Sequence, residues 1–372
     1  MMSAPSPEDR PAPETLSSVF HVYEVRERGE RLLYFGEPLA NQQRIMEAVW
    51  PAFREAGYEV HLTRQTGEFV LVAEPRSVGE DAIPWTNVAL FVATVLSTLF
   101  VGAQWYYVRD PLSTAIVSAI PFTLAVMGVL GTHELGHYVM SRYHDVDASL
   151  PYFIPFPTIV GTMGAVIRMR GQIPDREALF DIGVAGPIAG LLATVVVSAV
   201  GLMLPPVAVP EWVLAAQSTV EVEFGYPPLL HAIAWQLDAP LVYDDPTKVI
   251  NPVVIGGWVA MFITFLNLIP VGQLDGGHIL RAMVGPAQER IAPLVPTALF
   301  ALAGYLFFVR DVGQVVGIWV LWGIMAAIVS AFGSARPIDD SPLDGRRVAI
   351  GIVTFVIGAL CFTPVPIQIV GP

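Results

Sequence analysis

The hydrophobic pattern changes near residue 84. From there to the end of the chain, seven long apolar stretches lie near 84–108, 112–141, 178–205, 249–271, 291–309, 313–334 and 347–366. A helix that crosses a bilayer needs about 20 apolar residues, so each stretch can form one. We therefore predict a polytopic α-helical membrane protein with about seven transmembrane helices.

The residues before this region have the pattern of a small soluble domain. Segments 18–25, 31–37, 58–64 and 68–74 alternate like β-strands, and 38–57 has apolar residues at helical spacing. We predict a soluble cytoplasmic α+β domain of order ββαββ over 18–76, which acts as a regulatory or docking module. The proline-rich residues 1–17 predict a disordered tail. The membrane domain is then 84–372, with its core at 112–290.

The segment 152–171 is too polar and too broken for a transmembrane helix. It begins with prolines and continues with β-branched residues and glycine, which favours a short membrane-associated β-hairpin. Its edge could hold an extended peptide by strand addition, and a purely structural re-entrant loop is the alternative. After it, Gly183, Gly186 and Gly190 give one helix a smooth face for close packing.

Composition supports the division of the chain. Of all residues 54% are hydrophobic and 14% are charged, against about 25% charged in a soluble domain. The segment 1–83 holds 14 acidic and 8 basic side chains, and the longer segment 84–372 holds 19 and 12. These values argue against a wholly soluble enzyme. The single cysteine, Cys361, excludes an intrachain disulfide and a cysteine-rich zinc site.

The net charge of −13 argues against nucleic acid as a partner. With Lys248 as the one lysine, the acidity is typical of adaptation to high salt, as in halophilic archaea. The basic residues also predict an orientation. With seven helices, nine arginines fall on the side of the N-terminal domain: Arg142, Arg168, Arg170, Arg176, Arg281, Arg290, Arg336, Arg346 and Arg347. The opposite side receives Arg109, Lys248 and Arg310. The positive-inside rule then predicts a multi-pass protein of the cell membrane, with the N-terminus and the active-site side cytoplasmic.

A candidate metal site ends the second apolar stretch. His133, Glu134 and His137 form H-E-x-x-H, and the run from Pro111 to Thr132 that precedes them carries no charge. On a helix, positions i and i+4 share a face, so both imidazoles can bind one zinc ion. Glu134 lies beside them and can accept a proton from water at the metal. The alternative is a polar cap at the membrane surface.

A third zinc ligand is needed, and the fourth apolar stretch offers candidates. No charge occurs from Val249 to Leu274, and then come Asp275 and, after two glycines, His278. Asp275 is the natural third ligand and His278 competes with it, while a helix N-cap is the other interpretation of Asp275. Asn267 lies in the same apolar run and either bridges two helices or contacts a substrate carbonyl.

These residues carry a family resemblance. H-E-L-G-H on one helix, followed by N-L-I-P-V-G-Q-L-D-G-G, resembles the site-2 protease family of intramembrane zinc metalloproteases, whose second motif N-x-x-P-x-x-x-x-D-G fits at every position. The segment 149–190 is similar to the subgroup that includes chloroplast membrane proteases linked to gravitropism and greening. The resemblance implies that His133, His137 and Asp275 bind one Zn²⁺, that Glu134 is the general base, and that Asn267 contacts substrate or transition state.

The expected activity is hydrolysis of peptide bonds in transmembrane substrate proteins, within or near the lipid bilayer. No acyl-enzyme is expected, because no serine or cysteine nucleophile accompanies a base in the sequence. The alternative is a transporter or metal-handling membrane protein, which would spread its ionisable residues as a relay along several helices.

Overall fold

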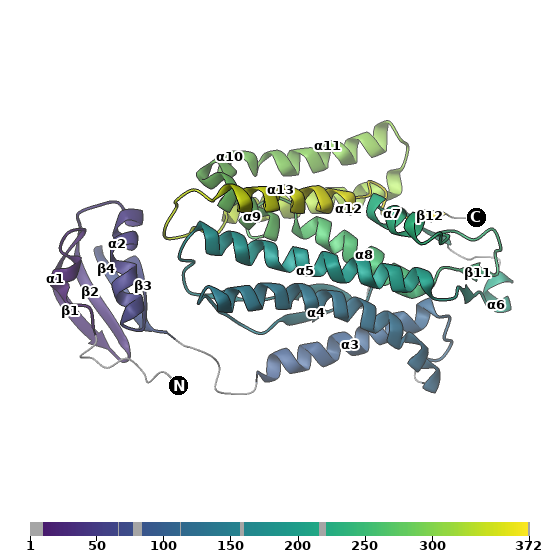
Figure 1. The fold of residues 1–372 in the computed structure, drawn as a ribbon, viewed down its shortest axis with the longest axis horizontal. Coiled ribbons are helices and arrows are strands. Elements are labelled where there is room, and N and C mark those ends of the chain that lie inside the picture. Colours follow the sequence, from purple (N-terminus) through teal and green to yellow (C-terminus); the bar gives the residue numbers. More distant parts are fainter. Residues whose placement is uncertain are drawn as a thin grey trace.

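A computed structural model describes residues 10–65, 67–76, 84–111, 113–156, 160–215 and 221–370. Figure 1 shows a small sheet domain at one end of a bundle of long helices. The long helices of the bundle run roughly along the longest axis of the molecule (Figure 1).

The sheet domain combines four antiparallel strands with a short helix and a longer one. Its elements are α1 (Pro13–Leu16), β1 (Phe20–Arg28), β2 (Arg31–Pro38), α2 (Gln42–Glu55), β3 (Tyr58–Gln65) and β4 (Glu68–Pro75), and the strand order is β1-β2-β4-β3. The Asn41 side chain begins α2 by accepting a hydrogen bond from the Arg44 amide. The stripe of Ile45, Val49 and Phe53 is fully buried against the sheet.

The expected tail differs from the structure where it is described. Residues 10–17 are folded: Leu16 belongs to the domain core, and the Tyr34 hydroxyl donates to the Pro11 carbonyl oxygen at 3.0 Å. Burial raises the pKa of Tyr34 to about 12. Leu16 and the Pro11 carbonyl thus tie this part of the segment to the domain. Residues 1–9 lie outside the described residues.

The bundle is built from helices that follow the apolar stretches. The long ones are α3 (Trp85–Trp105), α4 (Ile120–Tyr143), α5 (Arg176–Met203), α8 (Pro252–Asn267), α9 (Asp275–Val284), α11 (Leu294–Phe308), α12 (Gly313–Phe332) and α13 (Gly345–Leu360). Shorter pieces are η2 (Thr114–Ala119), α6 (Glu211–Leu214), α7 (Pro228–Gln236), η3 (Gly285–Ala287) and α10 (Gln288–Ile291).

Their lengths are those of a membrane protein, although fewer than the expected seven are full spans. Among the described residues, four segments are long and apolar enough to cross a bilayer: 85–105, 114–143, 176–203 and 313–332. A fifth is added if 275–291 and 294–308, bent by 64°, count as one. With 16 residues each, α8 and α13 are about 24 Å long, short of the ~30 Å apolar layer.

Short strands close the loops at both ends of the bundle. β6 (Tyr152–Pro155) and β7 (Thr162–Val166) form a hairpin in the region where one was expected, and residues 157–159 lie outside the described residues. β5 (Asp147–Ala148) pairs with β8 (Met169–Arg170) at the base of this hairpin. At the end of the bundle away from the sheet domain, β9 (Val207–Ala208) pairs with β11 (Lys248–Val249), and β10 (Glu221–Phe224) with β12 (Ile367–Val370).

Glycines bring the central helices α4, α5 and α8 close together. A Cβ on Gly136 of α4 would lie 2.6 Å from the Ala185 carbonyl oxygen of α5, and one on Gly201 of α5 would lie 2.7 Å from the Val254 amide nitrogen of α8. Such distances are shorter than a Cβ atom tolerates. The helices can therefore pack this closely only because these two positions carry no side chain. The close approach places the polar residues of α4 directly against α5.

Candidate metal centre

Three side chains from two helices converge inside the bundle. His133 and His137 lie one turn apart in the second half of α4, and Asp275 is the first residue of α9. His133 Nε2 lies 3.1 Å from Asp275 Oδ2, His137 Nε2 lies 3.3 Å from Asp275 Oδ1, and the two Nε2 atoms are 3.2 Å apart. Of the described residues, these three form the one group of three or more His, Cys, Asp or Glu that could hold a metal ion.

The donor set fits a zinc ion. Ligand atoms about 2.0–2.1 Å from a tetrahedrally coordinated ion lie about 3.3 Å from one another. The two Nε2 atoms are 3.2 Å apart, close to this value, and each lies 3.1–3.3 Å from one of the two carboxylate oxygens of Asp275. Two imidazoles and one carboxylate also form a ligand set of catalytic zinc sites, in which the fourth position is open to water or substrate.

The carboxylate of Asp275 is available for this role. The N-cap of α9 is Leu274, and no side chain caps the helix, so the N-cap interpretation of Asp275 does not hold. His278, the competing ligand, lies one turn further along α9 and is 5% exposed. Its Nε2 is buried without a hydrogen-bond partner among the described residues, and it lies outside the group of three.

Helix α5 fixes the orientation of the His137 ring. The Nδ1 atom lies 2.8 Å from the Ile182 carbonyl oxygen. A carbonyl only accepts, so Nδ1 carries the proton and Nε2 presents its lone pair to the centre of the group. No pattern in the sequence indicates this contact, because the partner is a backbone atom.

Two of the three glycines on the smooth face of α5 make room for the histidines. A Cβ on Gly190 would lie 2.8 Å from His133 Nδ1, and a Cβ on Gly186 would overlap His137 Nε2. The third, Gly183, packs less tightly, and its Cβ would lie 3.3 Å from that of His278. The expected packing face is therefore also the wall of the site.

Glu134 faces the same region from α4. Its side chain is buried, with 4% exposed, and the backbone amide of Ile167 lies close to its carboxylate. Ile167 directly follows β7, so the chain at the end of the β6–β7 hairpin reaches the candidate base. The sequence predicted the hairpin but not this contact.

The turn between α8 and α9 carries the rest of the second motif. Asn267 is the last residue of α8 and is half-buried. A Cβ on Gly276 would collide with the Leu268 carbonyl, and one on Gly277 would lie 2.5 Å from the Gly272 carbonyl oxygen. The two glycines thus let the first turn of α9 fold back on 268–272 and bring Asp275 to the centre.

Two arginines that the sequence did not single out bind one aspartate and so link α5, α9 and the segment before α13. Arg176 Nε of α5 and Arg281 Nη1 of α9 donate to the same oxygen of Asp340, at 2.5 and 2.8 Å. The two arginine side chains are buried, with 9% and 7% of their surface exposed. Burial acts to raise the pKa of Asp340, but the two guanidinium groups outweigh it and hold this pKa below its ordinary value.

A second cluster joins the end of α4 to α5 and α13. His144 Nε2 lies 3.0 Å from Asp181 Oδ2, and Arg347 donates to both oxygens of Asp181 at 2.9 Å. His144 is therefore a link between helices. The partners in both clusters are far apart in the chain, so no local pattern indicates them.

Comparison with known proteins gives a consistent family. The model of "Peptidase family M50" matches residues 121–309. The "Probable zinc metalloprotease EGY1, chloroplastic" of Oryza sativa subsp. japonica is 27% identical over 380 residues, which is 88% of this chain and 62% of the relative. The protein of the same name in Arabidopsis thaliana is 37% identical over 171 residues, or 45% of this chain and 30% of the relative. No solved structure matches the chain.

A third relative extends the same pattern. The "Probable zinc metalloprotease EGY2, chloroplastic" of Arabidopsis thaliana is 28% identical over 313 residues, which is 81% of this chain and 53% of the relative. The chain thus spans less than two thirds of the length of each of these three relatives.

Proposed function

Because the chain belongs to peptidase family M50, we propose that it is an intramembrane zinc metalloprotease that hydrolyses peptide bonds of transmembrane proteins. One observation carries the proposal: His133, His137 and Asp275 meet at zinc-ligand spacing, and the buried Glu134 stands beside them on the same helix as the histidines. The relatives that carry the name zinc metalloprotease support it.

The residues of the site have three proposed roles: metal binding, proton transfer and substrate contact. His133, His137 and Asp275 would hold one zinc ion, which when bound supplies Lewis-acid chemistry to a peptide carbonyl and makes a water molecule more acidic. Glu134 accepts the proton of the attacking water and then delivers it to the leaving amine. Asn267, at the end of α8, contacts the substrate carbonyl or the developing oxyanion.

Substrate reaches the site in an extended form. A peptide in a helix cannot present its carbonyl, because the helical hydrogen bonds shield it. The β6–β7 hairpin offers an open strand edge, and the Ile167 amide next to β7 contacts the base. Strand addition along β7 would therefore lead a substrate backbone toward Glu134.

The proposed topology has seven membrane crossings. The helices α8, α11 and α13 would cross with α3, α4, α5 and α12, although they are shorter than the usual span. The sheet domain lies at the end of the bundle where α4 ends and α5 begins (Figure 1). The excess of arginine on that side supports a cytoplasmic N-terminus and a cytoplasmic active-site side in a cell membrane. Transmembrane proteins and the surrounding lipid are the proposed partners.

The test is Glu134→Gln in the purified full-length protein with a model transmembrane substrate. We expect cleavage to fall by at least about 100-fold, the contribution of a general base, with zinc content unchanged. Glu30→Gln, at an exposed glutamate in the β1–β2 turn, is the matched control and should cleave normally. A zinc-loaded Glu134→Gln protein that cleaves at the wild-type rate would refute the mechanism.

The transporter alternative has no support in the structure or in the relatives. A relay would spread ionisable groups along several helices. Among the described residues, the candidate ligands form one cluster instead.

A further inference from the structure

The sheet domain contacts the bundle through a carbonyl just after α4. Arg54 Nη2 of α2 and Arg76 Nη2, which follows β4, each donate to the Asp145 carbonyl oxygen at 2.9 Å. Arg54 Nη2 also lies 3.4 Å from the His144 carbonyl oxygen. Asp145 has a positive φ of 58°, a left-handed conformation that residues other than glycine seldom adopt.

A second contact lies further along the chain, just after β8. The Gln172 amide lies close to the carboxylate of Glu59 on β3, and a Cβ on Gly171 would lie 3.1 Å from Glu59 Oε1. Gly171 has a φ of 88°, a conformation that favours glycine. The sheet domain therefore contacts the bundle at residue 145 and at residues 171–172.

These two points are the ends of one loop, which we call the hairpin segment, residues 145–172. The β5–β8 pair closes its base, and the Ser149 amide and Arg168 carbonyl continue that pairing at 2.9 Å. The segment contains the β6–β7 hairpin and Ile167, whose amide contacts Glu134. A shift of either end would be transmitted along paired strands to the candidate base.

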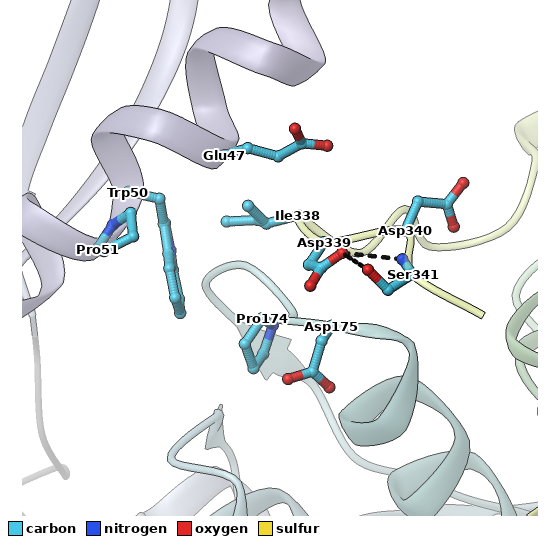
Figure 2. A pocket seen from close by; sticks show the side chains of 9 residues that line it. All are labelled: Glu47, Trp50, Pro51, Pro174, Asp175, Ile338, Asp339, Asp340 and Ser341. Atoms are coloured by element: carbon cyan, nitrogen blue, oxygen red, sulfur yellow. Dashed lines mark hydrogen bonds between the residues drawn. The ribbon is translucent and has the colours of Figure 1, made fainter. Parts of the chain in front are cut away.

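The contact between the two parts is loosely packed. A cavity of about 730 Å³ separates Glu47 and Trp50 of α2 from Asp175, Ile338 and Asp339 of the bundle (Figure 2). Three of these five side chains are acidic: Glu47 lies on the sheet domain, and Asp175 and Asp339 lie on the bundle (Figure 2).

Polar atoms at the contact are also incompletely paired. Arg54 Nη1 and Gln172 Oε1 are buried without hydrogen-bond partners among the described residues. Burial lowers the pKa of Arg54 and raises that of Glu59, so both groups lose hydration when the parts dock. An interface that desolvates charges while leaving atoms unpaired contributes little net free energy. The docked state is therefore open to perturbation.

We propose that the sheet domain is a clamp on the hairpin segment, and that Arg54 and Arg76 are positioning residues that hold this segment against Glu134 for cleavage. The inference rests on the proposed protease function for its link to catalysis, but the clamp itself is a statement about structure. When the domain is docked, both ends of the segment are fixed. When it undocks, the substrate-binding edge of β7 loses its rigid base.

The experiment compares Arg54→Ala/Arg76→Ala with the full-length wild type in detergent micelles by hydrogen exchange. We expect amides of 149–168 to exchange about tenfold faster, as for loss of one or two charge-assisted hydrogen bonds, with α2 and β3 unchanged. Arg44→Ala, at an exposed arginine of α2, is the matched control and should exchange like wild type. Arg54→Lys/Arg76→Lys keeps a donor at each position and should restore part of the protection.

The cleavage arm measures kcat and KM of the same variants. We expect kcat/KM to fall about tenfold through a higher KM, because the hairpin holds substrate and Glu134 itself is unchanged. Unchanged exchange in 149–168 would overturn the clamp. Faster exchange with unchanged kcat/KM would overturn its role in cleavage. If the wild type cleaves nothing, the proposed function fails, and the exchange result still decides whether the domain clamps the segment.

Discussion

The wall of the site formed by α5 gives a sharp prediction for Gly186→Ala. The added methyl would overlap His137 Nε2, the atom that faces the centre of the group. Carbon and nitrogen atoms need about 3.4 Å between them, so the ring would have to move by more than about 1 Å. The ring cannot simply rotate away, because Nδ1 is tied to the carbonyl oxygen of Ile182, which lies on the same helix as Gly186.

A displacement of this size is large on the scale of metal coordination. Metal–ligand distances hold to about ±0.2 Å, and even indirect disturbance of a ligand lowers metal affinity about 10–100-fold. We therefore expect the zinc affinity of Gly186→Ala to fall by at least about 100-fold. The assay is competition with a chromophoric chelator on purified protein, with thermal unfolding of the metal-free protein as a check on folding.

Two glycines of α4 supply the controls. A Cβ on Gly131, two residues before His133, meets nothing within 4 Å, so Gly131→Ala should bind zinc normally. Gly136→Ala would meet the Ala185 backbone of α5 and separate the helices without touching a histidine, so it should affect stability more than affinity. A folded Gly186→Ala protein with wild-type zinc affinity would show that His137 Nε2 is not a ligand.

Three other variants probe the ligand set, the arginine pair and the docked domain. Asp275→Ala should lower zinc affinity by at least about 100-fold, whereas His278→Ala should leave zinc affinity unchanged. If a chelator titration gave the opposite result, His278 and not Asp275 would be the third ligand. Asp340→Ala leaves two buried guanidinium groups unpaired, so chemical denaturation should show a loss of about 3–5 kcal/mol, and a loss below about 1 kcal/mol would contradict the pairing. Burial raises the pKa of Glu59 against the opposing effect of Arg76, so the docked domain binds this proton more tightly than the free domain. Docking, followed by hydrogen exchange of 149–168, should therefore strengthen as pH falls through the raised pKa and weaken above it, and Glu59→Gln should remove this dependence.

The sequence predicted those parts of the molecule that local rules determine. The H-E-x-x-H spacing placed His133 and His137 on one helical face, and the charge-free run before Asp275 marked a second buried position. Both predictions rely on periodicity and on the cost of burying charge, which act over a few residues. The structure brings these side chains to within hydrogen-bond distance.

What the sequence did not predict depends on contacts between distant segments or on backbone atoms. The Ile182 carbonyl and the Ile167 amide carry no side-chain signature, although they orient His137 and contact Glu134. Asp340 pairs with an arginine 164 residues earlier in the chain, and no local spacing reveals such a partner. The predicted length of the fourth membrane helix was wrong for another reason. The apolar composition continues past Asn267, but the turn that follows this residue ends α8 there.

The placement of the ligands on α4 and α9 has a consequence for the mechanics of the fold. His133 and Asp275 are 142 residues apart in sequence, so an ion shared between them would act as a cross-link that closes a loop of this length. Binding to the folded state alone would add about 2.7 kcal/mol of stability at a free-ion concentration about 100 times Kd. The amount of free metal would then set how firmly α4 and α9 are held together, as well as how many molecules can react.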